Sequence, residues 1–494
     1  MNTIFSTRTI GRLAPLAALL LSACATGPAY VRPSITVPDH YKEAAGSGWL
    51  PAQPADAQVR GNWWTLLGDD TLNQLESRVD AGNQSIAKSV ANLQTAKAET
   101  RAARAQYFPI VTAGADASRF HTSQNVVGRS LAGKTVSDYD AGLDVTWEPD
   151  LFGRIAHQVD AAQARYQADD ADLASVRLAV HAELAIDYVD LRAADEEAQL
   201  LQRTVEDFQH ARDLVAVRVK GGIASQSDLE QAETQLQVAD AQRVDLGESR
   251  AHYEHAIATL VGVAPAQLSI AASSAAMTLP DVPAGVPSTL LERRPDVAAA
   301  ERRVAAANAD VGEATSAFFP DLVLSASGGV EASGFAQLAT LPSRFWALGP
   351  ALVGTLFDGG RRKAALHAAQ AREDAAAADY RQTALTAFQE VEDDLSSLHV
   401  LADESVVQQR AVTAAGSAEA LALTRYKDGA TDYLDVVTTQ SINLTQRRAQ
   451  VELSRRQLES DIRLVKALGG DWSGTAGSGQ QAASAALTQA RPKA

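Results

Sequence analysis

The sequence is poor in cysteine, in aromatic residues and in basic charge. Among its 494 residues there is 1 cysteine, which excludes a disulfide framework or a cysteine-based zinc site within one chain. Aromatic residues make up 5% and hydrophobic residues 46%, so the apolar content is mostly alanine, leucine and valine, which suits closely packed helices. With 44 basic against 60 acidic residues the formal net charge is -16, which argues against a nucleic-acid-binding protein.

Long hydrophobic runs are also missing. After Cys24 no apolar stretch reaches the roughly 18 residues that a transmembrane helix needs. Before it, Arg8 and Arg12 precede a short apolar run, Leu13–Leu21, followed by small residues, which is typical of a secretory signal peptide. The mature protein is therefore expected to be exported. Either it crosses a membrane with strands, or it does not cross and is held at the membrane by a lipid anchor alone.

The two halves of the chain resemble each other at a spacing of 207 residues. Four residues near a glycine turn recur at this offset, in the pairs Arg218 and Arg425, Lys220 and Lys427, Gly222 and Gly429, and Asp228 and Asp435. The period is far longer than a solenoid repeat, so the duplicated unit is half of the protein.

Each half is expected to begin with a helix, over about 71–106 and about 295–317. Each helix should end at an aromatic–proline pair, because proline disfavours the helical conformation in the residue before it. Polar and apolar residues alternate over 138–147, and the stretches 322–330 and 345–357 are rich in small residues. These patterns predict about two strands per half, each long enough to cross a membrane.

A very long helix is expected to follow the strands of each half. No proline or glycine interrupts the chain from Arg154 to Val219, which at about 1.5 Å per residue predicts a rod of roughly 100 Å. Such a helix needs neighbours along its length, so coiled-coil-like packing is expected. Gly221 and Gly222 end it, a shorter helix returns, and the second half repeats the pattern at Gly429.

Motifs for catalysis or cofactor binding are weak. Residues 128–135 match the phosphate-binding loop pattern, but a strand pattern follows where that loop requires a helix, so no nucleotide is expected. His252 and His255 lie three apart on a helix without an evident third ligand, so no metal site is expected. Acidic pairs fall on long charged helices. The protein is therefore not expected to be an enzyme.

Four strands are too few to close a membrane barrel, because single-chain barrels start at about eight and an open edge leaves backbone groups unpaired in lipid. Either the strands stay out of the membrane or the chain assembles with copies of itself. Three copies would supply twelve strands.

Several motifs together resemble the TolC superfamily, and within it the NodT-type (OprM-like) outer-membrane lipoproteins. They are a lipobox ending at Cys24, the string Leu290–Val297, the aromatic–proline pairs, the segments Trp147–Arg154 and Leu356–Arg361, and the duplicated glycine turns. The resemblance implies a mostly α fold with a membrane β-barrel, in which a homotrimer builds a long α-helical barrel and a twelve-stranded β-barrel. It also implies a passive export duct in the outer membrane, with partners in a periplasmic adaptor and an inner-membrane RND-type pump.

The resemblance further implies site residues, all near the glycine turns except for one. Cys24 would carry the covalent N-acyl and diacylglycerol lipid, the one non-protein group expected, and would anchor the chain in outer-membrane lipid. The turn residues expected to contact the adaptor are Gly221, Gly222, Ile223, Gly429 and Ala430. The residues expected at a periplasmic gate are Tyr426, Leu434, Asp435, Thr438 and Asp228. Thr438 stands where the family motif has an aspartate, so an acidic gate ring is one alternative and local capping by Asp228 and Asp435 is the other.

Six segments are expected along the chain, from composition and from the resemblance together. They are a signal peptide at 1–23, a lipidated extended segment at 24–70, a first repeat at 71–263, a linker at 264–288, a second repeat at 289–470, and a disordered tail at 471–494. Two other functions are also compatible with the sequence. One is a channel of the same superfamily for type I protein secretion, and the other is a lipid-anchored periplasmic coiled-coil scaffold.

Overall fold

The computed structural model describes residues 27–38, 40–43, 62–125, 130–273, 277 and 294–470. The predicted signal peptide, Cys24, most of the predicted linker and the predicted tail lie outside the described residues. The chain divides into two compact units, and both of its longest helices contribute residues to each of them. The first unit comprises 1–33, 93–169 and 300–380, and the second comprises 34–92, 170–299 and 381–494.

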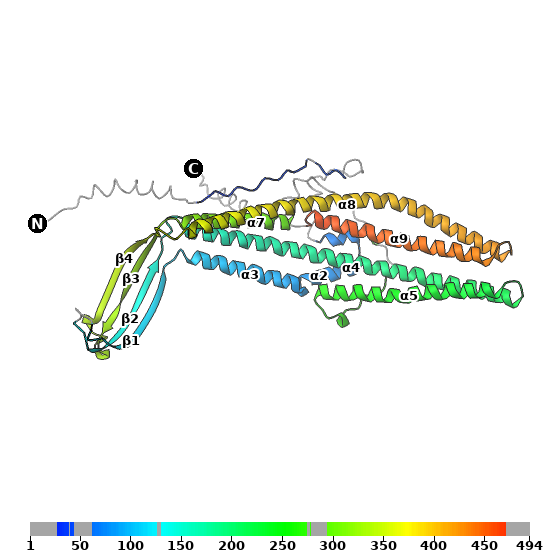
Figure 1. Ribbon diagram of the computed structural model, residues 1–494. Helices are drawn as coiled ribbons and strands as arrows, with labels where there is room; N and C mark the ends of the chain where they lie inside the picture. Colours follow the sequence, from blue (N-terminus) through cyan, green and yellow to red (C-terminus); the bar gives the residue numbers. More distant parts are fainter. Residues whose placement is uncertain are drawn as a thin grey trace, which may run out of the picture. The chain divides into compact units, whose positions relative to one another are not determined.

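The first unit contains one antiparallel sheet in the order β1-β2-β3-β4, drawn side by side in Figure 1. Its strands are β1 (Ile110–His121), β2 (Thr135–Trp147), β3 (Asp321–Ala332) and β4 (Arg344–Val353). Strands β2 and β3 pair across the two halves of the chain, with Gly142 opposite Gly329. A Cβ atom at Gly329 would lie 2.3 Å from the Ala141 carbonyl oxygen, so only glycine permits this close approach.

The expected strand count is confirmed. The strand expected to follow the phosphate-loop pattern is present as β2, which begins at Thr135, the last residue of that pattern. Strands β1 and β4 are the two edges of the sheet, and neither edge is paired within the described chain. None of the described helices combines the length and hydropathy needed to span a lipid bilayer.

The helices repeat the duplication in detail. Helices α4 (Arg154–Lys220) and α8 (Arg361–Lys427) each have 67 residues, and both their first and their last residues lie 207 positions apart. The returning helices, α5 (Gln226–Val261) and α9 (Tyr433–Ala467), begin at the same offset. The α4–α5 turn and the α8–α9 turn are therefore equal in length.

Helix α7 (Pro295–Ser316) matches the expected first helix of the second half, but the corresponding helix of the first half is divided. It forms α2 (Asp70–Gly82) and α3 (Gln84–Ala105), so the prediction of one continuous helix over 71–106 was wrong. Asn83 is extended, and its side-chain oxygen accepts from the backbone N–H groups of Ser85 (2.9 Å) and Ile86 (3.1 Å). This cap starts α3 anew.

The expectation that the whole segment 24–70 is extended also needs correction. A short 3-10 helix, η1 (Trp63–Leu67), lies within it, and the Trp63 and Trp64 side chains are 4% and 8% exposed. Two indole rings have a large apolar surface whose burial is favourable. Their burial therefore packs this part of the segment against the core of the second unit. The other short 3-10 helices are η2 (Pro265–Gln267), η3 (Phe335–Gln337) and η4 (Leu341–Ser343).

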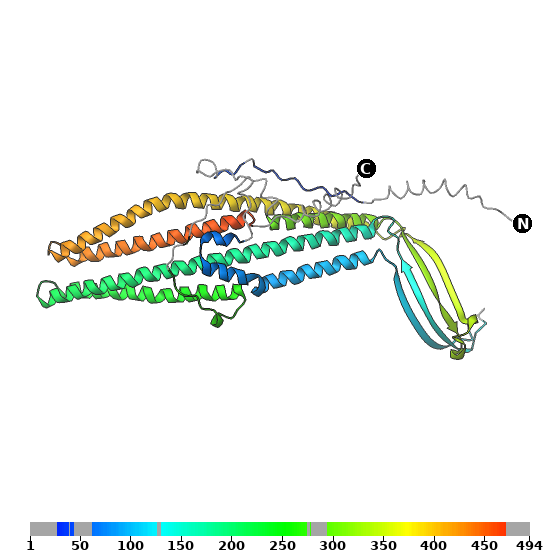
Figure 2. The same ribbon diagram turned by 180° about the vertical axis from the view of Figure 1, so that it is seen from behind.

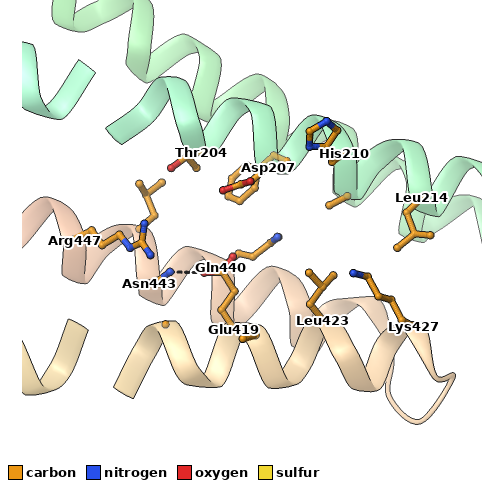
Figure 3. A pocket seen from close by; sticks show the side chains of 15 residues that line it. Thr204, Asp207, His210, Leu214, Glu419, Leu423, Lys427, Gln440, Asn443 and Arg447 are labelled. Atoms are coloured by element: carbon orange, nitrogen blue, oxygen red, sulfur yellow. Dashed lines mark hydrogen bonds between the residues drawn. The ribbon is translucent and has the colours of Figure 1, made fainter. Parts of the chain in front are cut away.

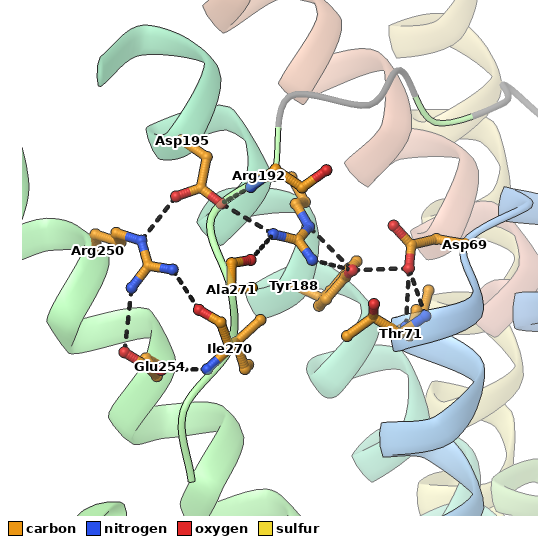
Figure 4. Close-up of polar contacts among 11 residues, drawn as sticks. Asp69, Thr71, Tyr188, Arg192, Asp195, Arg250, Glu254, Ile270 and Ala271 are labelled. Carbon is orange, nitrogen blue, oxygen red and sulfur yellow. Dashed lines mark hydrogen bonds and ion pairs between the residues drawn. The ribbon is translucent and has the colours of Figure 1, made fainter. Parts of the chain in front are cut away.

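A buried polar network holds the second unit together, shown in Figure 4. The Arg192 guanidinium on α4 donates to the Tyr188 hydroxyl (2.6 Å), to Asp195 (2.9 Å) and to the Ala271 carbonyl oxygen (2.8 Å). Tyr188 in turn donates to Asp69, the N-cap residue of α2, at 2.8 Å. Because Arg192 is 6% exposed, its charge has little contact with water and is stabilised by these partners instead. The same contacts hold the segment after α5 against α4.

The network continues onto α5 through a second arginine. Arg250 donates to the other Asp195 oxygen (2.7 Å) and to the Ile270 carbonyl oxygen (2.6 Å), while the Ile270 N–H donates to Glu254 at 2.5 Å. Asp195 is therefore shared between α4 and α5, and residues 270–271 are held from both sides.

A second buried polar contact joins α2 to α4. The Glu76 carboxylate lies 2.6 Å from Nδ1 of His181, with side chains 0% and 8% exposed respectively. The Trp64 ring stacks on the His181 ring with centroids 4.6 Å apart. Burial raises the pKa of Glu76 to about 7, against the lowering effect of His181.

Candidate functional site

The candidate site consists of the two glycine turns and the helix ends beside them, all in the second unit. In the α4–α5 turn Gly222 has φ 70, and the Ile223 N–H donates to the Arg218 carbonyl oxygen at 2.9 Å. In the α8–α9 turn Gly429 has φ 75, and the Ala430 N–H donates to the Arg425 carbonyl oxygen at 2.8 Å. Both helices thus end in the same left-handed glycine cap, at the turns visible in Figure 2.

The five predicted turn residues are exposed. They are Gly221, Gly222, Ile223, Gly429 and Ala430. Ile223 is the largest of them, and 70% of its surface is exposed. An isolated branched aliphatic side chain at the tip of a hairpin is available for contact with another protein.

Arg218 joins the two hairpins. Its Nη1 donates to the carbonyl oxygens of Tyr426 (2.8 Å) and Lys427 (3.1 Å), the last residues of α8. Its guanidinium carbon lies 4.6 Å from the centroid of the Tyr426 ring. A cation at the C-terminus of a helix satisfies terminal carbonyl groups and the helix dipole, and the ring adds a cation–π contact.

Two tyrosines fill the core behind the contact between Arg218 and the end of α8, which we call the joint. The rings of Tyr426 and Tyr433 meet edge to face with centroids 5.2 Å apart, and they are 4% and 2% exposed. They pack with Val215, Ala232 and Val436, so all four helices of the two hairpins contribute. Burial raises the pKa of Tyr433 to about 12 and also raises the pKa of Tyr426. Both phenols therefore stay neutral near pH 7, and Arg218 and Asp228 are the charged groups that act on them.

The predicted gate residues are divided between three environments. Tyr426 lies inside the joint, whereas the Leu434 side chain, in the first turn of α9, is 59% exposed. The Thr438 hydroxyl donates back to the Leu434 carbonyl oxygen at 2.8 Å. Asp228 closes a capping box with Ser225, and Asp435 accepts from the Thr431 hydroxyl. Both aspartates thus make local contacts at the starts of α5 and α9.

Behind the turns a cavity of about 570 Å³ lies between α4, α8 and α9, shown in Figure 3. Asp207 and Glu419 bring acidic groups to it and Arg447 a basic one, so its wall carries both signs of charge. Gln440 and Asn443 are 3% and 6% exposed, and the Asn443 amide donates to Glu419. The helix pairs are therefore not packed solidly here, since a polar space separates them.

Sequence reasoning missed Arg218 and Tyr433 as parts of this site. The repeat of Arg218 at Arg425 was visible, but nothing local shows that the first arginine reaches the other hairpin. The contact joins residues 208 apart in sequence.

The family model described as outer membrane efflux protein matches residues 75–263 and 286–470. The chain is 31% identical to outer membrane protein OprJ of Pseudomonas aeruginosa, over 94% of this chain and 96% of that one. It is 30% identical to the toluene efflux pump outer membrane protein TtgC of Pseudomonas putida, over 94% and 96% of the respective chains.

Solved structures give the same result. The outer-membrane channel OprN superposes with a TM-score of 0.86 at 31% identity, over 91% of this chain and 100% of that one. The open state of the MtrE outer membrane channel of Neisseria gonorrhoeae superposes with a TM-score of 0.80 at 26% identity, over 91% and 98%. The resemblance found in the sequence motifs is thus confirmed, and the chain belongs to the outer membrane efflux protein family.

Proposed function

We propose that this protein is the outer-membrane channel of a tripartite efflux system and works as a homotrimer. The observation that carries the proposal is the sheet of four strands whose two edges, β1 and β4, are unpaired within the described chain. An unpaired edge in lipid leaves backbone N–H and C=O groups without partners, so the edges must meet other copies. Three copies with four strands each close a barrel of twelve strands.

The glycine turns then lie in the periplasm and form the periplasmic tip of the channel. Leu434 is the candidate for the closing ring, because its side chain is apolar and exposed beside the turn. Three leucines around a narrow pore exclude water and with it hydrated solutes. Tyr426 supports this ring from behind, and Thr438 lies one helical turn further along α9.

The exposed turns, with Ile223 at the end of one of them, are the surface offered to a periplasmic adaptor protein. The adaptor would connect the channel to an inner-membrane RND-type pump, and Cys24 would hold the chain in outer-membrane lipid through its acyl groups. In this arrangement the channel is a passive conduit, and the pump selects the small molecules that are exported.

A peptide tag inserted at Gly133 distinguishes this channel from a periplasmic scaffold. Gly133 lies in the turn between β1 and β2, with φ 70, at the end of the sheet remote from the helices that flank it in sequence. We expect antibody added to intact cells to bind this tag. A tag inserted at Gly222 in a separate variant is the control and should be reached only after the outer membrane is permeabilised. Access to the Gly133 tag only after permeabilisation would favour the scaffold.

A further inference from the structure

The two hairpins of one chain meet through unlike faces. Hairpin α4–α5 presents Arg218, and hairpin α8–α9 receives it at the end of α8. The hairpins are copies of each other, with matching helix ends and matching glycine turns. Within one chain this contact uses the donor face of the first hairpin and the acceptor face of the second. The acceptor face of the first hairpin and the donor face of the second are left free. Such head-to-tail contacts between equivalent hairpins are all satisfied only when the hairpins form a closed ring.

The free face of the second hairpin carries Arg425, the counterpart of Arg218 on α8. The Arg425 side chain is exposed and has no hydrogen bond or ion pair within the part of the chain that the structure describes. Leu421 lies one turn earlier and is 58% exposed, whereas its counterpart Leu214 packs against the core of the intrachain joint. The second hairpin thus has the same donor arginine and neighbouring leucine as the first hairpin, but within the described chain no helix end accepts from its arginine.

The free face of the first hairpin carries the matching acceptors. The counterparts of Tyr426 and Lys427 are Val219 and Lys220, the last residues of α4. The Val219 carbonyl oxygen accepts one bond, from the Gly222 N–H at 3.0 Å, just as the Tyr426 oxygen accepts one from the Gly429 N–H at 3.0 Å. A carbonyl oxygen can accept two bonds, and in Tyr426 the second comes from Arg218.

From this correspondence we infer that Arg425 of one copy caps the end of α4 in the next copy, donating to the carbonyl oxygens of Val219 and Lys220. Six arginine caps then alternate around the tip of the trimer, three within chains and three between them. The two kinds of joint are not equal, because Val219 replaces the aromatic ring on which Arg218 lies. The joint between copies is therefore the weaker one, and the tip separates there first.

The inference rests on the proposed trimer, and it can be tested in the full-length protein by linking pairs of introduced cysteines. The inter-copy pair is Arg425→Cys with Lys220→Cys, and the intrachain pair is Arg218→Cys with Lys427→Cys. A bifunctional thiol reagent about as long as an arginine side chain is applied to each variant. After denaturation we expect the first pair to give covalent species of two and three chains. The second pair should lose its free thiols and remain at the mass of one chain.

The native mass of the same samples before linking separates the two possible failures. A trimer in which the Arg425→Cys and Lys220→Cys pair yields only single chains would overturn the Arg425 cap and leave the channel intact. Absence of a trimer would overturn the proposed function itself.

A measurement without cysteines provides an independent test. We expect Arg425→Ala to lower the temperature at which the trimer dissociates in detergent. The matched variant Arg410→Ala, which removes another exposed arginine from α8, should leave that temperature unchanged. Equal temperatures for both variants would contradict the cap.

Discussion

Replacing Leu434 by serine is expected to raise the single-channel conductance in planar bilayers by about threefold to tenfold, a barrier change of roughly 0.7–1.4 kcal/mol. The leucine side chain is 59% exposed at the start of α9, and in the trimer three of them would face one another. Serine is shorter and polar, so water can enter the constriction and ions can follow. The increase should be present without adaptor protein, because the substitution removes the barrier itself.

The matched control is Val244→Ser. Val244 is 64% exposed near the middle of α5, so its replacement removes a similar apolar surface away from the turn. Its conductance should equal that of the unsubstituted protein. If Leu434→Ser also conducts like the unsubstituted protein, Leu434 is not the closing residue and the constriction must be sought elsewhere at the tip.

Replacing Glu76 by glutamine is expected to remove a pH dependence of stability of about 3 kcal/mol. In the folded protein burial raises the pKa of Glu76 to about 7, from an ordinary value near 4.5. Between these values the folded state keeps a proton that the unfolded state releases. The contribution of Glu76 to stability is therefore fully present below about pH 4.5 and is lost as the pH rises through 7.

The measurement is the melting temperature of the purified protein between pH 4.5 and 8. The unsubstituted protein should lose stability across this range, and Glu76→Gln should lose less. Asp80→Asn serves as the control, because Asp80 lies 3.8 Å from the same His181 ring but its side chain is 58% exposed. It should follow the unsubstituted protein closely, because the Asp80 charge is the smallest of the causes that shift the pKa of Glu76. Parallel curves for all three would show that Glu76 does not carry the raised pKa.

Local patterns in the sequence were sufficient for most of the fold. The end of α4 follows from Gly221 and Gly222, because glycine adopts the left-handed conformation that ends a helix more readily than any other residue. The alternation over 138–147 identified β2, which begins three residues earlier at Thr135. Helix and strand periods are local properties, and the 207-residue repeat allowed each half to support the interpretation of the other.

What the sequence could not show depends on contacts between distant residues. The break between α2 and α3 occurs where a Cβ at Gly82 would lie 2.0 Å from the Val261 carbonyl oxygen, and where Asn83 donates to the Leu260 carbonyl oxygen at 2.9 Å. The pair Gly82 and Asn83 is a local signal for a helix boundary, but no local signal reveals that α5 ends beside it. The joint between Arg218 and Tyr426 is of the same kind, since the two residues belong to different halves of the chain.

The motifs at the tip were located correctly along the chain, but their contacts were not foreseen. Tyr426 was expected at the gate, and the structure places its ring in the core beneath Arg218. Asp228 and Asp435 were expected either in an acidic ring or as local caps, and their hydrogen bonds are to Ser225 and Thr431 at helix starts. An acidic side chain near a helix start is ambiguous in sequence, because capping and pore lining both favour it.

The mass of the protein in lipid nanodiscs shows whether three chains together form the conduit. One chain contributes four strands and leaves β1 and β4 open, so a single chain in lipid should not be stable. We expect one species containing three chains. A stable species of one chain per disc would contradict it.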